Sequence, residues 1–599
     1  MPYTAAMRIF GRGIFAGNIN LLLLSCVVAG LWAAMGLSIV AAETAAFGSQ
    51  AHEDDGPGDQ AASVQAPGTR VIQDPLADKI NGILAAAELE HAQIGIRITT
   101  LTGQSLYALN EARLFTPASN TKLATTAAAS ALLPPALTWT TQVVASGEID
   151  DVGVLHGDLI LLGSGDPTLS GRIYPYRERL RPGSASLGAL ATARPDVWAP
   201  LDELAAQVAK AGVRQVAGGV IGDDTFFVHD PYGKGWEWDD LQWPYGAPVS
   251  ALSYNDNSIE LSWPPRASSS ASPTASGSVL ASASALPFSL ALPFWTPELP
   301  YYTIQGSMTA AEDGSAAQPG LDRPPGSRVV RVWGTVPATG FHANLAIEDP
   351  AEFAAMAFKE ALRRHGVRVS GTTTARHRPA ISTVAFAAQR AAPIVLRMPS
   401  IPQGTDRTTV AAPVEGLTVV GARFSASLAE EIVMTNKTSL NLHAELLLRL
   451  LGKLIGDDGS AAQGARVVRQ FLLTAGADEG EFSLWDGSGA STEDRISPRA
   501  VTKLLIYAAQ QPWGRAWRES LPVAGVDGTL AGRFGRSVLK GRIQAKTGTM
   551  SDANILSGYL SADSGRTVVF SIFINSHRPG SDGALRAIDH ICEAIAATE

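Results

Sequence analysis

The chain has 599 residues and a mass of 62.7 kDa, which is enough for about three or four domains at roughly 100–200 residues each. Hydrophobic residues make up 46% of it and charged residues 17%, so the composition excludes wholesale disorder. The formal net charge is −9, which argues against a nucleic-acid partner because phosphate binding requires concentrated positive charge. Two cysteines, Cys26 and Cys592, are too few for a disulfide framework. We expect a mostly globular protein whose stability comes from packing.

The amino terminus has the pattern of an export signal. Arg8 and Arg12 precede a long uncharged stretch with a leucine-rich core and small residues at its end, which suit cleavage. The same stretch is long enough, at roughly 20 residues per bilayer crossing, to remain as an uncleaved anchor. We therefore expect residues 1–42 to be a signal peptide, with an anchor as the alternative. The protein is then expected in the periplasm or cell envelope, and peripheral membrane association is a further alternative.

Apolar periodicity predicts regular elements near both ends of the remaining chain. Residues 75–92 have helical spacing, 94–100 alternate as a strand, and 105–109 form a second strand after a turn. Residues 555–560 and 567–575 are two further strand-like runs, and 584–597 are expected to form a closing helix. The carboxyl-terminal part therefore predicts an antiparallel meander backed by a helix.

Ser119 and Lys122 stand three residues apart at the start of an Ala-rich helix that Pro134 ends. Residues at this spacing share a helix face, so the Lys amine can remove the Ser proton if its own charge is suppressed. An exposed Lys has a pKa near 10.4 and is a poor base at neutral pH, so burial or a nearby positive charge is needed. The backbone N–H of Ser119 can help stabilise an oxyanion. Ser537 and Lys540 have the same spacing, but no apolar helix follows them, and we favour Ser119.

Ser439 and Asn441 precede a leucine-rich helix at 446–451. A hydroxyl at this place can relay a proton, and an amide can hold a substrate carbonyl while bonding Lys122. Helix capping, which Ser and Asn perform routinely, is the alternative for these two residues.

Lys546, Thr547 and Gly548 lie in an alternating run that predicts a strand. Lys546 can bind a substrate carboxylate and lower the pKa of Lys122, and Gly548 lets a substrate backbone pair closely. The N–H of Thr549 can complete an oxyanion hole. A turn without catalytic function is the alternative when the motif is taken alone.

Together the motifs follow the order Ser-x-x-Lys, Ser-x-Asn, Lys-Thr-Gly, each in its expected local context. The chain thus resembles the penicillin-binding, serine D-alanyl-D-alanine peptidase superfamily. Ser119 and Ser439 lie 320 residues apart, a spacing similar to that of the D-Ala-D-Ala carboxypeptidase/endopeptidase branch known as penicillin-binding protein 4 or DacB-like, the class C low-molecular-mass proteins. Further matching segments are 163–169, 222–227, 236–240, 245–257, 486–489 and 527–530. The resemblance covers most of residues 75–599.

The resemblance implies an α+β fold: a β-lactamase/transpeptidase-like domain, with an antiparallel sheet flanked by helices, that holds two nested, mainly β inserted domains. The expected segments are a flexible tether at 43–70, the catalytic domain at 71–140 and 425–599, inserted domain II at 141–257 and 381–424, and inserted domain III at 258–380. Two low-complexity stretches, 266–287 and 310–327, are expected to be surface loops.

Five more residues have competing interpretations. The resemblance implies that Asp166 binds the amino end of a diaminopimelate side chain, and a turn before the following proline is the alternative. His443 is interpreted as an exposed helix residue rather than as a base. Trp236, Trp238 and Trp243 are interpreted as packing residues rather than as a sugar-stacking surface.

The function that the resemblance implies is an exported serine D-Ala-D-Ala carboxypeptidase/endopeptidase. It would cleave peptidoglycan stem peptides through an acyl-enzyme on Ser119, and β-lactam antibiotics would acylate the same serine. The alternatives are a β-lactamase, a transpeptidase, and a catalytically silent wall-binding scaffold of the same fold. The sequence has no His-Glu-x-x-His and no phosphate-binding Gly-Lys-Ser/Thr segment, so no metal and no cofactor are expected. The oligomeric state is left open.

Overall fold

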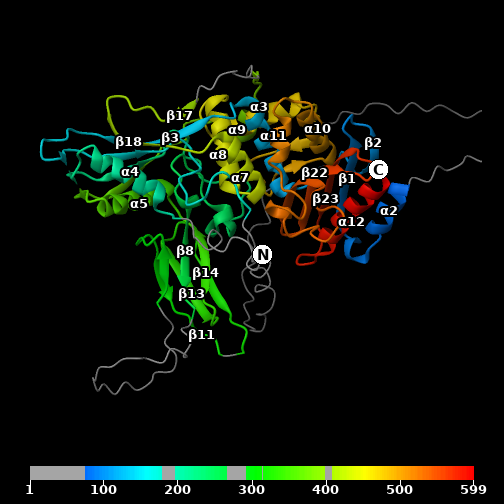
Figure 1. The fold of residues 1–599 in the computed structure, drawn as a ribbon, viewed down its shortest axis with the longest axis horizontal. Coiled ribbons are helices and arrows are strands. Elements are labelled where there is room, and N and C mark those ends of the chain that lie inside the picture. The colour runs from blue at the N-terminus through cyan, green and yellow to red at the C-terminus, as the bar shows by residue number, and fades with distance from the viewer. Residues whose placement is uncertain (1–74, 179–195, 266–291, 313, 398–407) are drawn as a thin grey trace, which may run out of the picture. The chain divides into compact units, whose positions relative to one another are not determined.

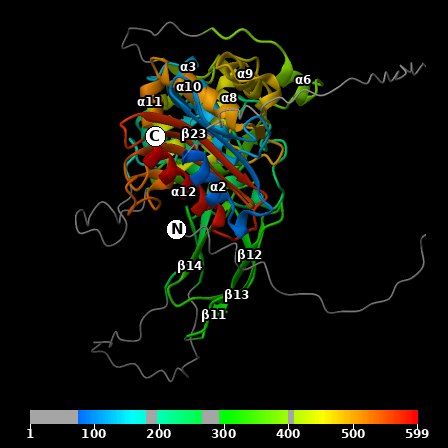
Figure 2. The same ribbon diagram turned by 90° about the vertical axis from the view of Figure 1, so that its right-hand side faces the viewer.

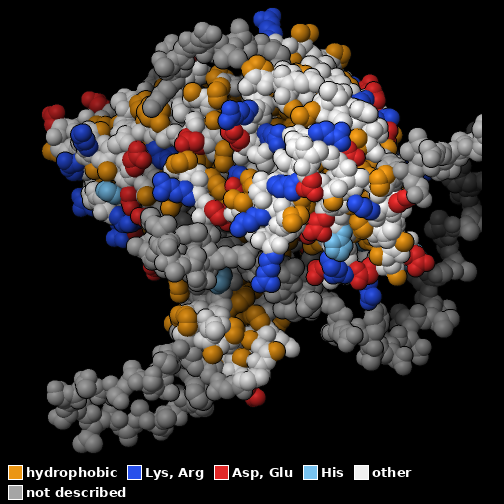
Figure 3. Space-filling view, turned by 45° about the vertical axis from the view of Figure 1, so that its right-hand side comes forward, with side chains coloured by type: hydrophobic (Ala, Val, Ile, Leu, Met, Phe, Trp, Pro, Cys, Tyr) orange, Lys and Arg blue, Asp and Glu red, His pale blue; other side chains and the backbone are white. Residues whose placement is uncertain are grey.

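The computed structural model describes residues 75–178, 196–265, 292–312, 314–397 and 408–599. The predicted signal peptide or anchor, the tether at 43–70 and the stretch at 266–287 lie outside these ranges. Within them, none of the helices combines the length and the apolar character needed to cross a bilayer. On the face shown in Figure 3, Lys and Arg side chains alternate with Asp and Glu, so the charge of this face is mixed rather than concentrated.

A five-stranded antiparallel sheet organises one part of the molecule (Figure 1). In spatial order its strands are β2 (Ser105–Leu109), β1 (Gln93–Thr100), β23 (Thr567–Asn575), β22 (Ala553–Ser561) and β21 (Ile543–Met550). Successive side chains of a strand point to opposite faces. On β23, accordingly, Ile572 belongs to one hydrophobic core and Phe573 to another. The sheet is therefore buried on both faces, and β21 forms one of its edges.

Helices cover each face of this sheet (Figure 2). On one side lie α2 (Pro75–Leu84), a short 3-10 turn at Ala87–Leu89, and α12 (Gly583–Thr598), whose buried stripe includes Ile588, Ile591 and Cys592. On the other side α10 (Pro498–Ala509) contacts three of the strands. The further helices of this part are α3 (Thr121–Leu132), α7 (Leu428–Thr438), α8 (Asn441–Leu454), α9 (Ala461–Thr474) and α11 (Gly514–Glu519), with a two-stranded ribbon of β19 (Phe482–Ser483) and β20 (Arg495–Ile496).

A six-stranded mixed sheet follows in the middle of the chain. Its strands are β16 (Thr373–Arg376), β7 (Val220–Asp223), β5 (Leu159–Leu162), β3 (Thr138–Ala145), β17 (Thr409–Ala411) and β18 (Thr418–Phe424). The four residues of β5 are all buried, as expected for a strand covered on both faces. The helices α4 (Ala199–Lys210) and α5 (Pro350–Arg364) pack together beside it. A small parallel sheet is formed by β4 (Val154–Leu155), β6 (Gln215–Val216) and β15 (Arg368–Val369), and α6 (Phe386–Ala391) contacts α9.

Two smaller sheets lie between β7 and α5 in sequence. One contains β14 (Phe341–Ala346), β8 (Ser258–Trp263) and β9 (Phe294–Thr296); the other contains β10 (Thr303–Gly306), β13 (Val329–Val336), β11 (Thr309–Ala310) and β12 (Pro319–Asp322). The prediction of a surface loop at 310–327 is wrong for β12, which pairs antiparallel with β13. Its Leu321 lies opposite Val332 and both side chains are buried. Hydrogen bonds between the two strands and this apolar contact therefore stabilise a strand in a segment whose low-complexity composition predicts a loop.

Inserted domain III was predicted to end at residue 380, but the strand pairing places the residues before 380 in the six-stranded sheet. The strand β16 pairs in parallel with β7, and α5 packs on α4. The apolar side of α5, with Phe353 and Phe358 fully buried, is covered by α4, β7 and β16. The chain therefore leaves the two smaller sheets after β14. The other domain boundaries stay predictions.

Most of the predicted elements are present. The strands at 105–109 and 567–575 have the predicted limits, and the closing helix differs by one residue at each end. The helix predicted at 75–92 is shorter, because α2 ends at Leu84 and a 3-10 turn then buries Leu89. The five-stranded antiparallel sheet with helices packed on its faces, together with the further sheets, makes this an α+β fold, as predicted.

Candidate active site

Ser119 lies on the 3-10 turn η2 (Ala118–Asn120), which leads directly into α3. The preceding Ala118 has φ +46°, a left-handed conformation that residues other than glycine seldom adopt. A Cβ atom on Gly489 would lie 1.8 Å from the carbonyl oxygen of Ala118, so the loop at 486–489 approaches this turn as closely as a glycine allows. The turn presents a half-buried Ser119 at the start of the helix.

Lys122 is fully buried one helical turn after Ser119. Its Nζ lies 2.9 Å from Ser119 Oγ, 2.7 Å from Asn441 Oδ1 and 2.7 Å from the carbonyl oxygen of Ser488. The orientation of the Asn441 amide is fixed, because its Nδ2 donates to the carbonyl of Tyr245 at 2.8 Å. The structure thus joins the first two motifs around one amine.

The surroundings of Lys122 make its amine a base near neutral pH. Burial lowers the pKa of Lys122 to about 7, against the opposing effects of Asp486, Glu445 and Asp494. Burial also raises the pKa of Glu445 to about 7 and the pKa of Asp494 well above its ordinary value. Carboxyl groups that keep their protons attract an ammonium only weakly. A substantial neutral fraction of Lys122 follows.

Ser439 terminates α7 in a left-handed conformation, with φ +60° and ψ +42°. Its Oγ accepts a hydrogen bond from Lys546 Nζ at 2.8 Å. Lys546 is fully buried and also donates to the carbonyl of Thr547 at 2.9 Å. Burial, and then the charge of Lys122, lower the pKa of Lys546 well below its ordinary value. The second and third motifs are therefore in direct contact.

The Lys-Thr-Gly motif lies on β21, at an edge of the five-stranded sheet. Asn120 Nδ2 donates to the carbonyl of Lys546 at 3.1 Å, which connects this strand to the turn η2 that carries Ser119. A Cβ atom on Gly548 would lie 2.7 Å from the carbonyl oxygen of Pro117. Thr549 is exposed. An edge strand whose next residues face solvent can accept an extended substrate segment beside it.

His443 is not an exposed residue, and the prediction that it is one is wrong. It is buried on α8, two residues after Asn441. Its Nδ1 lies 2.7 Å from Glu431 of α7, and its Nε2 lies 3.3 Å from Asp256. Burial opposes the charged imidazolium, but Glu431 and Asp256 outweigh it and raise the pKa of His443 to about 9. The charged ring therefore joins α7 to α8 across the turn that carries Ser439.

Asp166 is not part of the cluster around Ser119. Its carboxylate is buried, accepts from the backbone N–H and hydroxyl of Thr168 at 2.7 Å each, and lies 3.1 Å from Arg423. Burial raises the pKa of Asp166, and Arg423 opposes that effect. These bonds agree with the turn interpretation of Asp166, and its contact with the amino end of a diaminopimelate side chain stays a prediction.

The three tryptophans differ from one another. Trp236 donates from Nε1 to Asp486 Oδ2 at 2.9 Å, and Trp243 packs on the core of the inserted sheets. Trp238 is 72% exposed, so the packing interpretation fails for this residue.

Sequence reasoning gave no role to the loop at 486–489 or to the acids around Lys122. Asp486 accepts backbone N–H groups from Gly489 and Ser491 at 2.7 and 2.8 Å, which holds the Ser488 carbonyl toward Lys122. Glu445 in turn accepts from the N–H of Gly487 at 2.8 Å. The Asp-Gly-Ser-Gly motif was the available signal, since two glycines after an Asp predict a tight loop.

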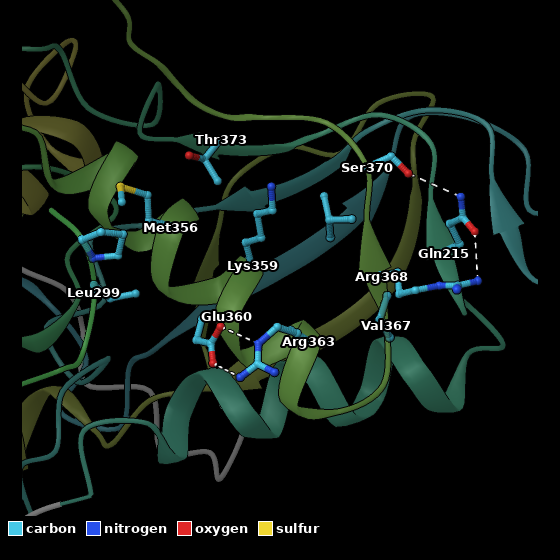
Figure 4. Close-up of a pocket in the computed structure, with 12 residues that line it drawn as sticks. Gln215, Leu299, Met356, Lys359, Glu360, Arg363, Val367, Arg368, Ser370 and Thr373 are labelled. Carbon is cyan, nitrogen blue, oxygen red and sulfur yellow. Dashed lines mark hydrogen bonds and ion pairs between the residues drawn. The ribbon is translucent and has the colours of Figure 1, made fainter.

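A cavity of about 730 Å³ lies elsewhere, against α5 and the strands β6 and β15 (Figure 4). None of the residues that line it belongs to the predicted site. Its polar groups largely bond one another, as Arg363 does with Glu360 and Gln215 with Ser370.

Comparison with known proteins identifies the family. The model of the D-Ala-D-Ala carboxypeptidase 3 (S13) family matches residues 76–408 and 403–596. The chain belongs to this family. A D-alanyl-D-alanine carboxypeptidase of Actinomadura sp. (strain R39) is 30% identical over 530 residues, which are 86% of this chain and 83% of the relative. The D-alanyl-D-alanine carboxypeptidase DacB of Haemophilus influenzae is 23% identical over 77% of this chain and 81% of its own.

The fold agrees with this membership. The crystal structure of penicillin-binding protein 4 (DacB) from Haemophilus influenzae matches with a TM-score of 0.64 at 20% identity, covering 85% of this chain and 97% of that one. This member of the S13 family is a serine-type D-Ala-D-Ala carboxypeptidase, a hydrolase, with a penicillin-binding-protein fold. The predicted family, fold class and enzyme class are therefore confirmed.

Proposed function

We propose that the enzyme cleaves peptidoglycan stem peptides at D-Ala–D-Ala through an acyl-enzyme on Ser119, with Lys122 as the general base. The contacts of Lys122 Nζ carry this proposal. A neutral amine has two N–H donors and one lone pair. The oxygens of Asn441 and Ser488 can only accept, so they take the two N–H groups. The lone pair then faces Ser119 Oγ at 2.9 Å.

In the first step the Ser119 proton passes to Lys122 as Oγ attacks the carbonyl of the penultimate D-alanine. The developing oxyanion is held by the N–H groups of Ser119 and Thr549. The C–N bond then breaks, and Ser439 gives its proton to the departing amine and regains the proton that Lys122 took from Ser119. The contact between Ser439 and Lys546 supports this relay. Water finally hydrolyses the ester and releases the acyl product.

Lys546 binds the carboxylate of the terminal residue, with Thr547 or Thr549 as a second contact. A carboxylate at this place raises the pKa of Lys546, because an opposite charge favours the ammonium. Substrate binding thereby opposes the effect of burial, which lowers the pKa of Lys546 in the free enzyme. Gly548 lets β21 lie directly against the turn that carries Ser119, because a Cβ atom there would be 2.7 Å from the carbonyl oxygen of Pro117.

The same serine supports two cleavages and one inhibition. Removal of a terminal D-alanine is carboxypeptidase action, and cleavage of a D-alanyl cross-link to a neighbouring stem is endopeptidase action. β-Lactam antibiotics acylate Ser119 because their amide occupies the place of the D-Ala–D-Ala bond. The basic and apolar pattern at 1–42 supports export to the periplasm or cell envelope, where these substrates lie.

The test is product analysis with two substrates, a stem peptide that ends in D-Ala–D-Ala and a cross-linked dimer of such peptides. Wild type is expected to release D-alanine from the first and to separate the second. Ser119→Ala is expected to do neither, whereas Ser537→Ala, which changes the other Ser-x-x-Lys match, is expected to keep both activities. Ser537 Oγ bonds Glu593 at the surface, so this variant is a matched control.

Other products would overturn parts of the proposal. Transfer of the acyl group to an added D-amino acid in place of hydrolysis would show a transpeptidase. Rapid turnover of benzylpenicillin would show a β-lactamase. Failure on both peptides, with retained binding to peptidoglycan, would show a scaffold.

A further inference from the structure

Two histidines and an aspartate converge outside the proposed active site. Asp224 follows β7 and His377 follows β16. Because these strands are parallel neighbours, their carboxyl ends place the two side chains together. His229 reaches the same point, as its backbone N–H donates to the carbonyl of Arg378 at 2.8 Å. One ligand atom from each of the three residues lies within 4.8 Å of the others.

The spacing of these atoms fits a metal ion. Asp224 Oδ1 lies 2.9 Å from His377 Nδ1, and Asp224 Oδ2 lies 3.8 Å from His229 Nδ1. Zinc ligands at about 2.0–2.1 Å in a tetrahedron are about 3.3 Å from one another. The two observed distances, which involve the two different oxygens of Asp224, lie on either side of this value. The three ligand atoms, which lie within 4.8 Å of one another, would therefore need to move closer to a common centre to bind one cation.

In the described part of the chain, no group lies within hydrogen-bond distance of His229 Nδ1, which is 3.8 Å from Asp224 Oδ2. If the cluster were only an ion pair of a protonated His377 with carboxylates, this atom would be buried without a partner, which is costly. A cation gives it one.

A second carboxylate orients His377. Asp349 Oδ2 lies 3.2 Å from His377 Nε2, so Nε2–H can donate to this carboxylate. Nδ1, which contacts Asp224 at 2.9 Å, can then exchange its proton for a metal. Metal-binding histidines usually donate their other N–H to such a carboxylate. Asp349 is itself held in place, because its Oδ1 caps α5 by accepting from Glu352 N at 3.0 Å.

We propose that Asp224, His229 and His377 bind one divalent transition-metal cation, with zinc as the best fit to two imidazoles and a carboxylate. Water would fill the fourth position. The site was not predicted from the sequence, where no metal was expected. The cation would tie β7, β16 and the loop at 225–231 together. The carbonyl of Asp230 in this loop accepts from Arg449 of α8 at 2.9 Å, so the loop also contacts the helix that Asn441 begins.

The test is zinc titration of the full, tag-free chain after chelator treatment, followed by calorimetry and by the shift in Tm. Wild type is expected to bind one zinc per chain and to gain thermal stability. His229→Ala is expected to lose this site, while His156→Ala is expected to keep it. His156 is exposed and also lies 2.9 Å from an aspartate, Asp150, so it controls for the loss of a histidine beside a carboxylate.

Asp349→Asn adds a second readout. Asn still caps a helix, but it is a poorer acceptor for His377, and loss of such a partner weakens metal binding about 10- to 100-fold. Cobalt in place of zinc is expected to give the visible absorption of a tetrahedral site in wild type alone. The proposal is overturned if metal-free wild type takes up no zinc, or if folded His229→Ala, checked by circular dichroism, still binds one zinc with unchanged affinity.

Discussion

The pH dependence of acylation tests the role of Lys122. If its neutral amine is the base, the rate constant for acylation by a fluorescent penicillin follows the neutral fraction of this one group. Because burial lowers the pKa of Lys122 to about 7, about a tenth of the enzyme is competent at pH 6 and about nine tenths at pH 8. The rate constant is therefore expected to rise about tenfold between these values and then to level off. An unshifted Lys would instead give a rise that continues toward pH 10.

Asp486→Asn perturbs this profile in a known direction. The charge of Asp486 raises the pKa of Lys122, so its removal is expected to move the inflection to lower pH. Glu493→Gln removes the same charge from an exposed residue that pairs with Lys234, and solvent screening is expected to leave the profile unchanged. A flat profile in wild type, a rate that falls as pH rises through 7, or a shift to higher pH in Asp486→Asn would refute the reasoning.

Two further predictions concern positioning. Gly548→Ala would bring a Cβ atom 2.7 Å from the carbonyl oxygen of Pro117. The resulting displacement of β21 from the Ser119 turn, by about 1 Å, is expected to slow acylation about 100-fold. Gly535→Ala, which has open space around its Cβ position, should acylate at the wild-type rate. His443→Ala leaves the buried Glu431 without its cation and Asp256 with Arg172 alone, and is expected to cost about 3 kcal/mol in urea unfolding at pH 6.5. The exposed His590→Ala should cost little. Since the pKa of His443 is raised to about 9, its contribution of about 3 kcal/mol is complete below about pH 6.5 and is lost as pH rises through 9; an unfolding difference that grows with pH would contradict this.

The sequence predicted the residues of the three motifs because their chemistry restricts residue type and order. The strand β1 was predictable because alternation of apolar and polar residues is a local signal, and β23 because a short run rich in β-branched and aromatic residues is typical of a strand covered on both faces. Ser119, Lys122, Ser439, Asn441 and Lys546 then meet through contacts in the structure, although they come from η2, α3, the end of α7, α8 and β21.

What the sequence did not predict depends on packing between distant segments. His443 was wrongly predicted to be exposed, because the neighbouring residues in the sequence do not show that a single polar helix residue is buried. Its partners Glu431 and Asp256 come from other segments. Ser488 contacts Lys122 through its backbone carbonyl, and a backbone contact cannot be predicted from the type of the side chain. The metal-binding geometry at Asp224 and His377 required the parallel pairing of β7 with β16.

The most direct test of the central claim is the intact mass of the protein after exposure to benzylpenicillin, with peptide mapping of the adduct. We expect one stable penicilloyl group on wild type, located on Ser119, and none on Ser119→Ala. An adduct that persists on Ser119→Ala, or wild type that gains no adduct and turns over no drug, would contradict it.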